Sequence, residues 1–393
     1  MASGGFPDFN NTEIAFRARS SLELRKALWL FRSFNYQWLV GGGEIALRLA
    51  FSLRLPVQSL VRFAFFDHFC GGTTIADALT RVNALGEYQV RSILDYSVEG
   101  QQSEAAFDVA LNETLRIIAT AANKQQLLLP FTAIKMTAIG RFDLLAKASA
   151  GTVMTRAETA ELALVAGRLH QLCAASAAAG LHLLVDAEET WIQAAVDRLV
   201  LEQMEVFNRE RVVVYNTLQM YRTDRLDYLY ELHAIGKARG FKVGAKLVRG
   251  AYMEKERAYA AALGVVSPIQ PNKAATDHAF DVAITYCTQH LDDIAIFAGT
   301  HNEDSVRHLT KRMAAARLAP DDRRIECSQL LGMSDNLTYN LAHKGYRVSK
   351  YVPYGPVAAV LPYLARRAAE NSSVAGQAQR ELQLIERELK RRG

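Results

Sequence analysis

From about residue 88 onward, short apolar runs rich in β-branched residues alternate with longer amphipathic stretches. Buried parallel strands appear in a sequence as short apolar runs, and the helices that cover them appear as longer stretches with one apolar face. About eight runs fit this description of a strand. They are VRSILDYSV, PFTAIKMTA, LHLLVDAE, RVVVYNTLQMY, FKVGAKLVRGAY, IAIFAGTHN, RRIECSQL and YRVSKYVPYG.

Eight strands that alternate with helices form the repeat of a closed (β/α)8 barrel. An open doubly wound sheet is the alternative, but that fold usually carries a G-x-G-x-x-G motif after its first strand. The sequence has no such motif, and its glycine clusters Gly41–Gly43 and Gly71–Gly72 stand in helical or connecting context. We therefore expect an α/β fold built on a TIM-like (β/α)8 barrel.

The segment before the barrel has a different pattern. Residues 13–66 predict helices rich in basic and aromatic residues, interrupted by Gly41–Gly43 and by Pro56. One interpretation is an amphipathic arm that packs on the main domain, and the alternative is a surface that rests on a membrane or a partner. The expected organisation is an N-terminal helical arm (1–85), a barrel (86–371) and a charged C-terminal helix (372–393).

Composition narrows the class of protein. The 393 residues are 50% hydrophobic with a net charge of +5, and basic and acidic residues are interleaved, which argues against a nucleic-acid groove. The four cysteines are far apart and form no C-x-x-C pair, which argues against a disulfide framework and a structural zinc site. No run of eighteen apolar residues and no signal-peptide pattern is present, so we expect a cytoplasmic protein. No metal site is expected.

Polar or ionisable residues stand at the C-terminal side of almost every expected strand. In a barrel these ends converge on one face, where catalytic groups are placed. Two of them have structural alternatives, because Asp186 could cap the following helix and Lys135 could belong to a buried ion pair. The residues are Asp95, Glu99, Lys135, Asp186, Gln219, Lys246, His301, Asn302, Gln329 and Tyr351.

The helix expected after the last strand presents Tyr363, Arg366, Arg367 and Glu370 on one face, because their spacing is i, i+3, i+4 and i+7. Paired arginines suit bidentate capture of a carboxylate or phosphate. The alternative is a solvated face with an Arg366–Glu370 pair. In the segment KLVRGAY, Gly250 would let the backbone approach a ligand closely.

These segments resemble the proline dehydrogenase family over nearly all of residues 65–393. The motifs that carry the resemblance are FCGG, ILDYSVEG, IKMTAIGR, LLVDAEET, NTLQMY, KLVRGAYMEKER, GTHNED, QLLGM, KYVPYGP and LPYLARRAAENSS. The resemblance implies a distorted (β/α)8 barrel that binds FAD without a Rossmann domain. It also implies oxidation of L-proline to Δ1-pyrroline-5-carboxylate, the first step of proline degradation to glutamate, with electrons passed from the flavin to a membrane quinone.

The resemblance assigns substrate roles by motif. It implies that Arg366 and Arg367 grip the substrate carboxylate with help from Lys135, and that Glu99 pairs with Arg366 to close the site. Tyr351 is the position at which the sister enzymes that oxidise 4-hydroxyproline have a small residue. The residues implied to wall the pyrrolidine ring are Leu247, Ala251, Tyr252, Tyr351 and Tyr363.

The resemblance also assigns the cofactor side of the site. It implies that the backbone around Val248–Gly250 meets the FAD pyrophosphate and that Lys246 lies near the flavin N5 and O4 edge, where bifunctional bacterial relatives carry arginine. Asp186 is implied to be catalytic with Lys246 and Lys135, and it would orient Tyr252 or Lys135. The amine proton would go either to Asp186 or to water. The implied FAD-binding residues are Gln219, Lys246, Val248, Gly250, Lys273, Thr300, His301, Asn302, Gln329 and Glu370.

Partners follow from the same resemblance. Only a short charged helix follows residue 371, so the expected product goes to a separate pyrroline-5-carboxylate (glutamate semialdehyde) dehydrogenase. The expected electron acceptor is a membrane quinone, with peripheral contact to the cytoplasmic face of the inner membrane as one option for the N-terminal arm. No nucleic-acid partner is expected.

Overall fold

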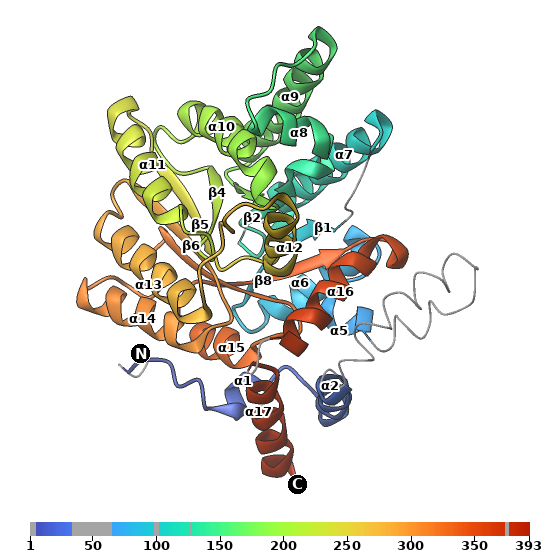
Figure 1. Ribbon diagram of the computed structural model, residues 1–393. Coiled ribbons are helices and arrows are strands. Elements are labelled where there is room, and N and C mark those ends of the chain that lie inside the picture. The colour runs from blue at the N-terminus through green and yellow to red at the C-terminus, as the bar shows by residue number, and fades with distance from the viewer. Residues whose placement is uncertain (1–4, 34–64, 98–101, 126, 374–376) are drawn as a thin grey trace. The chain divides into compact units, whose positions relative to one another are not determined.

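The computed structural model describes residues 5–33, 65–97, 102–125, 127–373 and 377–393 (Figure 1). Eight parallel strands close into a barrel in the order β1 to β8, which confirms the expected fold class. Each strand lies inside one of the eight apolar runs of the sequence. The strands are β1 (Arg91–Tyr96), β2 (Phe131–Lys135), β3 (His182–Asp186), β4 (Val214–Gln219), β5 (Val243–Val248), β6 (Ile294–Gly299), β7 (Ile325–Leu330) and β8 (Val348–Tyr354).

The chain divides into two compact units. One, called here the barrel unit, comprises residues 93–96 and 100–328, and the other, called here the terminal unit, comprises residues 1–92, 97–99 and 329–393. The helices of the barrel unit lie outside strands β2 to β6 (Figure 1). They are α7 (Glu104–Thr120), α8 (Phe142–Ser149), α9 (Arg156–Ala178), α10 (Thr190–Phe207), α11 (Arg225–Arg239), α12 (Met253–Leu263), α13 (Lys273–Gln289) and α14 (Glu303–Ala315), with the short turns η2 (Ala121–Gln125) and η3 (Met136–Ala138).

Aromatic residues fill the interior of the barrel unit near the beginning of the strands. The Phe131 ring packs edge-on against Phe297 at 5.1 Å and stacks on His182 at 4.9 Å. Because side chains alternate along a strand, the residues four positions later on β2 and β3 face the same side. These residues are Lys135 and Asp186, so the apolar plug lies beneath the polar strand ends.

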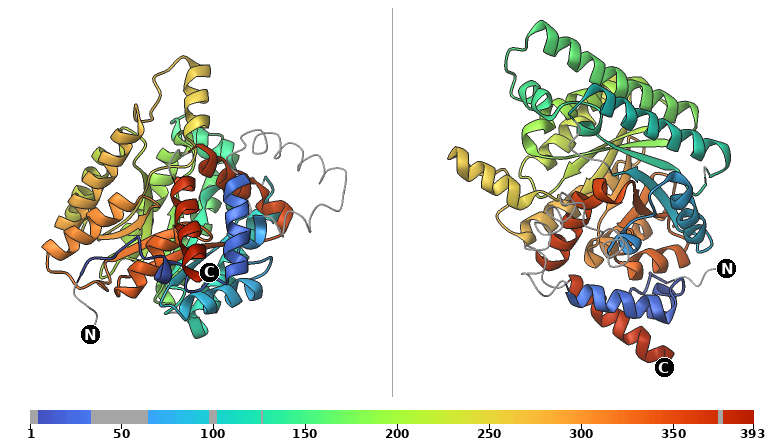
Figure 2. Two further views of the ribbon diagram at one scale, coloured as in Figure 1. Left: turned by 90° about the horizontal axis from the view of Figure 1, so that it is seen from below. Right: turned by 90° about the vertical axis from the view of Figure 1, so that its right-hand side faces the viewer.

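The terminal unit contains its own apolar core, made by segments from both ends of the chain. Helix α2 buries Leu24, Leu30 and Phe31 in a cluster that also contains Leu384 of α17. Figures 1 and 2 show α2 and α17 side by side. The helices of this unit are α1 (Thr12–Ala15), α2 (Ser21–Ser33), α5 (Asp67–Phe69), α6 (Ile75–Gly86), α15 (Asp335–His343), α16 (Val357–Ser373) and α17 (Gln377–Arg392).

Helix α2 therefore packs its apolar face inside the terminal unit, as an amphipathic arm does. The rest of the expected arm, residues 34–64 with Gly41–Gly43 and Pro56, lies outside the described residues. None of the helices in the described ranges is long and apolar enough to cross a membrane. The cysteines at 70, 173, 287 and 327 are buried free thiols.

Candidate active site

The ends of β2, β3 and β5 bring charged side chains together in the barrel unit. Lys135 and Asp186, the last residues of their strands, are register partners. The Lys246 ammonium donates to Asp186 Oδ1 at 2.5 Å, and both side chains are almost fully buried. Lys135 Nζ lies 3.9 Å from Asp95 Oδ2, also in a buried pair. The expected convergence of polar strand ends is therefore observed for these four residues.

These contacts separate the two structural alternatives. Helix α10 has Glu189 at its N-cap position, so Asp186 is not the cap and instead forms the ion pair with Lys246. Lys135 is indeed a member of a buried ion pair, with Asp95. Buried pairs of this kind contribute little net stability, because desolvation opposes the Coulombic gain. The ion pairs are therefore compatible with a ligand-binding role for Lys135 and Lys246.

A further carboxyl group lies just beyond Asp186, and sequence reasoning did not single it out. Glu188 is 6% exposed and accepts hydrogen bonds from the backbone N–H and the hydroxyl of Thr137, at 3.2 and 2.6 Å. The next residue, Glu189, pairs with Lys255 at the start of α12. The motif LLVDAEET contains both glutamates, but the contact of Glu188 with Thr137 depends on the register of β2 against β3.

The backbone after β5 is held against the residues that follow β4. Met220 N–H donates to Val248 O, and Tyr221 N–H donates to Arg249 O, both at 2.8 Å. Gly250 has a φ of 129°, and a Cβ there would lie 2.5 Å from the Tyr221 ring. Only glycine fits this conformation and this space. The following Ala251 and Tyr252 form the turn into α12, and Leu247 is fully buried.

Arg249 connects the ends of β5 and β6 to two helices, and sequence reasoning missed it. Its guanidinium donates to Asp277 at 2.7 Å, to the Thr300 hydroxyl at 2.6 Å and to the Ser305 hydroxyl at 2.9 Å. Lys273 also donates to Asp277, at 2.5 Å. Burial raises the pKa of Asp277, but hydrogen bonds from Lys273 and Arg249 outweigh it and hold this pKa below its usual value.

The remaining cofactor candidates of the barrel unit lie at the ends of β4 and β6. Asn302 caps α14 by accepting from the N–H groups of Asp304 and Ser305, at 2.9 and 3.1 Å, and His301 precedes it. The Gln219 Oε1 atom is buried and accepts no hydrogen bond from any described residue. A buried acceptor of this kind is able to take a hydrogen bond from a ligand donor.

The terminal unit carries the other expected residues. The Arg367 guanidinium lies over the Tyr363 ring at 5.1 Å in α16, and both residues are buried, while Arg366 is half-buried. Tyr351 on β8 is 8% exposed. Gln329 Oε1 accepts from the Thr338 hydroxyl at 2.8 Å. Glu99 lies outside the described residues, as does the side chain of Glu370.

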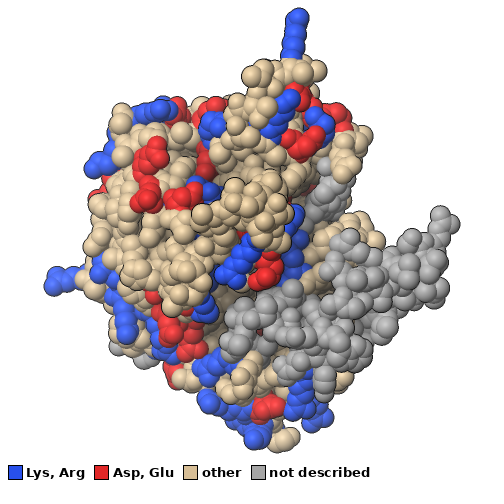
Figure 3. Space-filling view, in the orientation of Figure 1, with Lys and Arg blue, Asp and Glu red and all other residues tan. Residues whose placement is uncertain are grey.

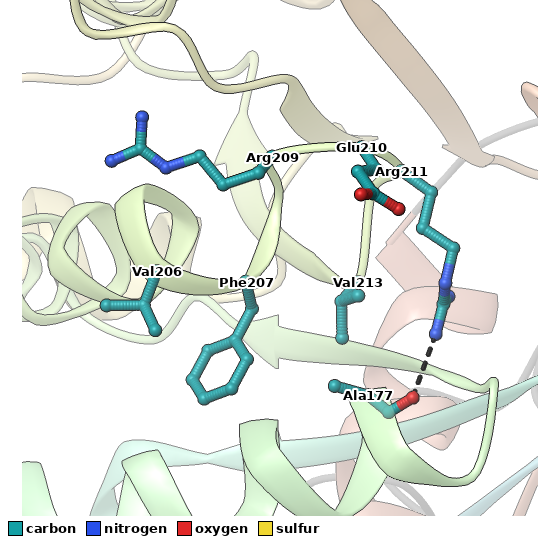
Figure 4. Close-up of a pocket in the computed structure, with 7 residues that line it drawn as sticks. All are labelled: Ala177, Val206, Phe207, Arg209, Glu210, Arg211 and Val213. Carbon is teal, nitrogen blue, oxygen red and sulfur yellow. Dashed lines mark hydrogen bonds between the residues drawn. The ribbon is translucent and has the colours of Figure 1, made fainter.

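Among the described residues, neither the charged surface nor the pocket of the structure adds a residue to this polar cluster. Acidic and basic side chains are interspersed on the face that Figure 3 shows, without a broad basic stripe among the residues drawn in colour. A pocket of about 270 Å³ lies in the barrel unit near the beginning of β4 (Figure 4). Because Gln219 ends that strand, this pocket is at the opposite end from the polar cluster. Its lining residues are Ala177, Val206, Phe207, Arg209, Glu210, Arg211 and Val213.

Comparison with known proteins places the chain in a family. The family model described as Proline dehydrogenase matches residues 78–380. The chain is 36% identical over 334 residues to carbapenem antibiotics biosynthesis protein CarD of Pectobacterium carotovorum subsp. carotovorum, covering 85% of each protein. It is 42% identical over 241 residues to mitochondrial proline dehydrogenase 1 of Homo sapiens, covering 61% of this chain and 40% of that protein.

A solved structure shows the same fold. Proline utilization A (PutA) from Bdellovibrio bacteriovorus matches with a TM-score of 0.74 and 17% sequence identity, over 97% of this chain and 44% of that one. The chain thus spans less than half the length of this protein and of the human relative. The structural likeness confirms the expected (β/α)8 barrel.

Proposed function

The chain belongs to the proline dehydrogenase family, and from this premise we propose that it oxidises L-proline to Δ1-pyrroline-5-carboxylate, with FAD as the hydride acceptor. The observation that carries the proposal is the largely buried cluster of Lys135, Asp186 and Lys246 at the strand ends, within the residues that the family model matches. Charges at this end of a barrel are typical of an enzyme active site.

The residues of the barrel unit fit an FAD cofactor. Gln219 offers a buried acceptor that no described residue satisfies, and Gly250 lets the chain after β5 lie against the Tyr221 ring, where a side chain would clash. In the proposed function, Lys246 lies at the flavin edge and Arg249 adds a cation to the region assigned to the pyrophosphate. FAD, when bound, supplies the acceptor for the hydride leaving the carbon beside the ring nitrogen. The cofactor residues assigned in the barrel unit are Gln219, Lys246, Val248, Gly250, Lys273, Thr300, His301 and Asn302. Gln329 and Glu370, which the resemblance also assigns to the cofactor, belong to the terminal unit.

In the same proposal, the substrate carboxylate is held by Arg366, Arg367 and Lys135. Guanidinium pairs suit this task because they bind a carboxylate in a bidentate, charge-assisted way. Tyr351 and Tyr363, with Leu247, Ala251 and Tyr252, are assigned to orient the ring, and Glu99 to pair with Arg366. Fixing one end of the substrate with charges and the ring with apolar walls is an effective way to align the reacting carbon.

Hydride loss requires an unprotonated proline nitrogen, so a proton must leave before or during the reaction. The proposal gives Asp186 the role of orienting the site or of accepting this proton. Its carboxylate is held at the strand ends by the ion pair with Lys246, which places it within the proposed site.

The decisive experiment is anaerobic addition of L-proline to the purified, FAD-loaded protein. We expect the yellow absorbance of oxidised flavin to bleach as the flavin is reduced. The product is then identified by trapping Δ1-pyrroline-5-carboxylate with an aromatic amine. A flavin that stays oxidised while proline binds would instead favour a non-catalytic, proline-binding barrel.

Electron transfer to a membrane quinone, and delivery of the product to a separate pyrroline-5-carboxylate dehydrogenase, complete the proposal. We also propose that the protein is cytoplasmic and makes peripheral contact with the inner membrane, where the quinone is dissolved. Helix α2 supports such a contact, because Leu22 and Trp29 are 65% and 62% exposed and flank the exposed Arg25 and Lys26 on one face. Exposed basic and aromatic residues on one helix face suit an anionic lipid surface.

A further inference from the structure

The buried carboxyl group of Glu188 has no part in the proposed function so far. It accepts both hydrogen bonds from Thr137, which stands two residues after Lys135. Glu188 itself stands two residues after Asp186, and Lys135 and Asp186 are register partners. Glu188 therefore ties the turn after β2 to the turn after β3, directly beside the lysine assigned to the substrate carboxylate.

The charges that face Glu188 set it apart from its neighbours. It forms no ion pair with any described residue, since its two hydrogen-bond donors are the neutral groups of Thr137. Burial raises the pKa of Glu188 to about 7, and adjacent Glu189 adds to the rise, while the Thr137 bonds and the Lys135 charge oppose it. The other carboxylates of the cluster each have an ammonium partner: Asp95 with Lys135, Asp186 with Lys246, and Glu189 with Lys255.

The contact with Thr137 can persist in both protonation states. A hydroxyl both donates and accepts, so it can donate to the Glu188 carboxylate and accept from the carboxylic acid. The backbone N–H of Thr137 can keep its bond to the other oxygen. Protonation therefore changes the charge beside Lys135 without breaking the connection between the two turns.

We propose that Glu188 is a proton-linked positioning residue, which takes up a proton when a carboxylate ligand binds at Lys135. This inference rests on the proposed function, because it uses the assigned role of Lys135. A ligand carboxylate adds a second negative charge beside Lys135, and like charges in a buried site favour the protonated form of one of them. Glu188 acts through Thr137 and Lys135 and need not touch the reacting atoms.

The test uses the FAD-loaded protein and tetrahydrofuran-2-carboxylate, which keeps the ring and carboxylate of proline but has no ionisable amine. Its affinity therefore reports protein groups alone. If binding raises the pKa of Glu188 by about one unit, the Kd should be about fivefold higher at pH 8 than at pH 6. Calorimetry at pH 7.5 in buffers of different ionisation enthalpy should show uptake of about half a proton per ligand.

Three variants separate this role from a merely structural one. Glu188→Gln should abolish the proton uptake and flatten the pH dependence, whereas loss of structure would weaken binding equally at every pH. Glu189→Gln is the matched control and should keep the uptake, because that carboxylate is paired with Lys255. Thr137→Val removes a bond to the charged form, so it should move the uptake to higher pH.

The outcomes distinguish this inference from the proposed function. Equal proton uptake in the unmodified protein and in Glu188→Gln, or no uptake in the unmodified protein, would overturn the role of Glu188 while proline still bleaches the flavin. The second of these results needs no variant, so it decides even if Glu188→Gln fails to fold. Absence of both analogue binding and bleaching would overturn the proposed function, and this inference with it.

Discussion

Lys246 on β5 and Asp186 on β3 form a buried ion pair at 2.5 Å that reaches across the end of β4. The strand between them contributes Thr217, the register partner of Lys246. A lysine and an aspartate on alternate strands of a barrel can meet only if both side chains point inward from the same level. The pair therefore holds one ammonium and one carboxylate group in place within the proposed site.

Lys246→Met should slow the reduction of the flavin by proline while the protein still folds. The change leaves Asp186 without this ammonium partner and removes the cation proposed to lie at the flavin edge. We expect the rate of flavin reduction by proline to fall about a hundredfold, as for loss of one preorganised electrostatic group. Lys246→Arg keeps the charge and is the control; stopped-flow absorbance should show it within about tenfold of the unmodified protein. Equal rates in all three proteins would contradict the assignment.

Replacing either Arg366 or Arg367 by Met should raise the KM for proline steeply while FAD stays bound. The lost interaction is a charge-assisted hydrogen bond to the substrate carboxylate. We expect a loss of roughly 2 to 4 kcal/mol in kcat/KM for each variant. Steady-state kinetics and the flavin-to-protein absorbance ratio measure the two effects. Arg380→Met on α17, where the side chain contacts Asn10, serves as the control. An unchanged KM in both test variants would refute the carboxylate role.

The sequence predicts some of these relationships and not others. Lys135 and Asp186 follow short apolar runs, so their place at strand ends, and hence on one face of the barrel, follows from the pattern alone. The bond between Glu188 and Thr137 joins residues 51 positions apart, and the register of two strands decides it. Sequence periodicity carries no information about that register in strands that are apolar on both faces.

Arg249 and helix α2 make two further kinds of contact that the sequence alone does not predict. Arg249 stands inside the segment KLVRGAY, but its three acceptors come from α13, from the residue after β6 and from α14, so only the folded chain brings them together. The pattern of α2 predicts one apolar face. It does not show that the covering surface is α17, more than 340 residues further along the chain.

The outer face of α2 should govern attachment to anionic vesicles. Because its inner face is buried in the terminal unit, deletion of the arm would expose the core, and surface substitutions are the sharper test. Arg25→Glu should weaken sedimentation with anionic vesicles at low salt roughly tenfold or more, and Trp29→Ala should weaken it less. Lys311→Glu on α14 and Leu164→Ala on α9 are matched exposed controls. Equal partitioning of all variants would remove the membrane interpretation.

Glu381 on α17 should make the stability of the protein fall as the pH rises. Burial raises the pKa of Glu381 to about 7, with Asp335 adding to the rise and Lys350 opposing it. The folded state then binds its proton more tightly than the unfolded chain does, so this contribution is complete below the ordinary value of 4.5 and is lost as the pH rises toward about 7. The cost of the buried charge at pH 8 is roughly 1 to 3 kcal/mol.

Glu381→Gln removes this ionisation and keeps an acceptor for the Ser334 N–H, which Glu381 binds at 3.2 Å. The Tm of Glu381→Gln minus that of the unmodified protein should therefore increase from pH 5 to pH 8. Glu388→Gln on the same helix is the matched control. Arg391 and Arg392 hold the pKa of Glu388 at about 2, so its effect should be constant over that range. A parallel pH profile for Glu381→Gln would show that Glu381 ionises normally.

Tyr351 should determine the preference for proline over trans-4-hydroxy-L-proline. It is buried on β8, and its neighbour Lys350 is anchored by hydrogen bonds to Met333 O at 2.5 Å and by an ion pair with Asp335 at 2.9 Å. Adjacent strand residues face opposite sides, so Lys350 points to one side of β8 and Tyr351 to the other. In the proposed site, the bulky Tyr351 ring would leave no room for a C4 hydroxyl and would offer it no well-placed partner.

The expected preference for proline is about tenfold to a few hundredfold in kcat/KM, the range of a 1 to 3 kcal/mol steric and desolvation penalty. Tyr351→Ser should narrow this gap, chiefly by slowing proline turnover, because the pyrrolidine ring loses a wall that aligns its reacting carbon. Tyr351→Phe keeps the ring and should keep the preference, which separates the effect of bulk from that of the phenol hydroxyl. Measuring both substrates on the three proteins is sufficient. A gap that Tyr351→Ser leaves untouched would place the selectivity at another residue.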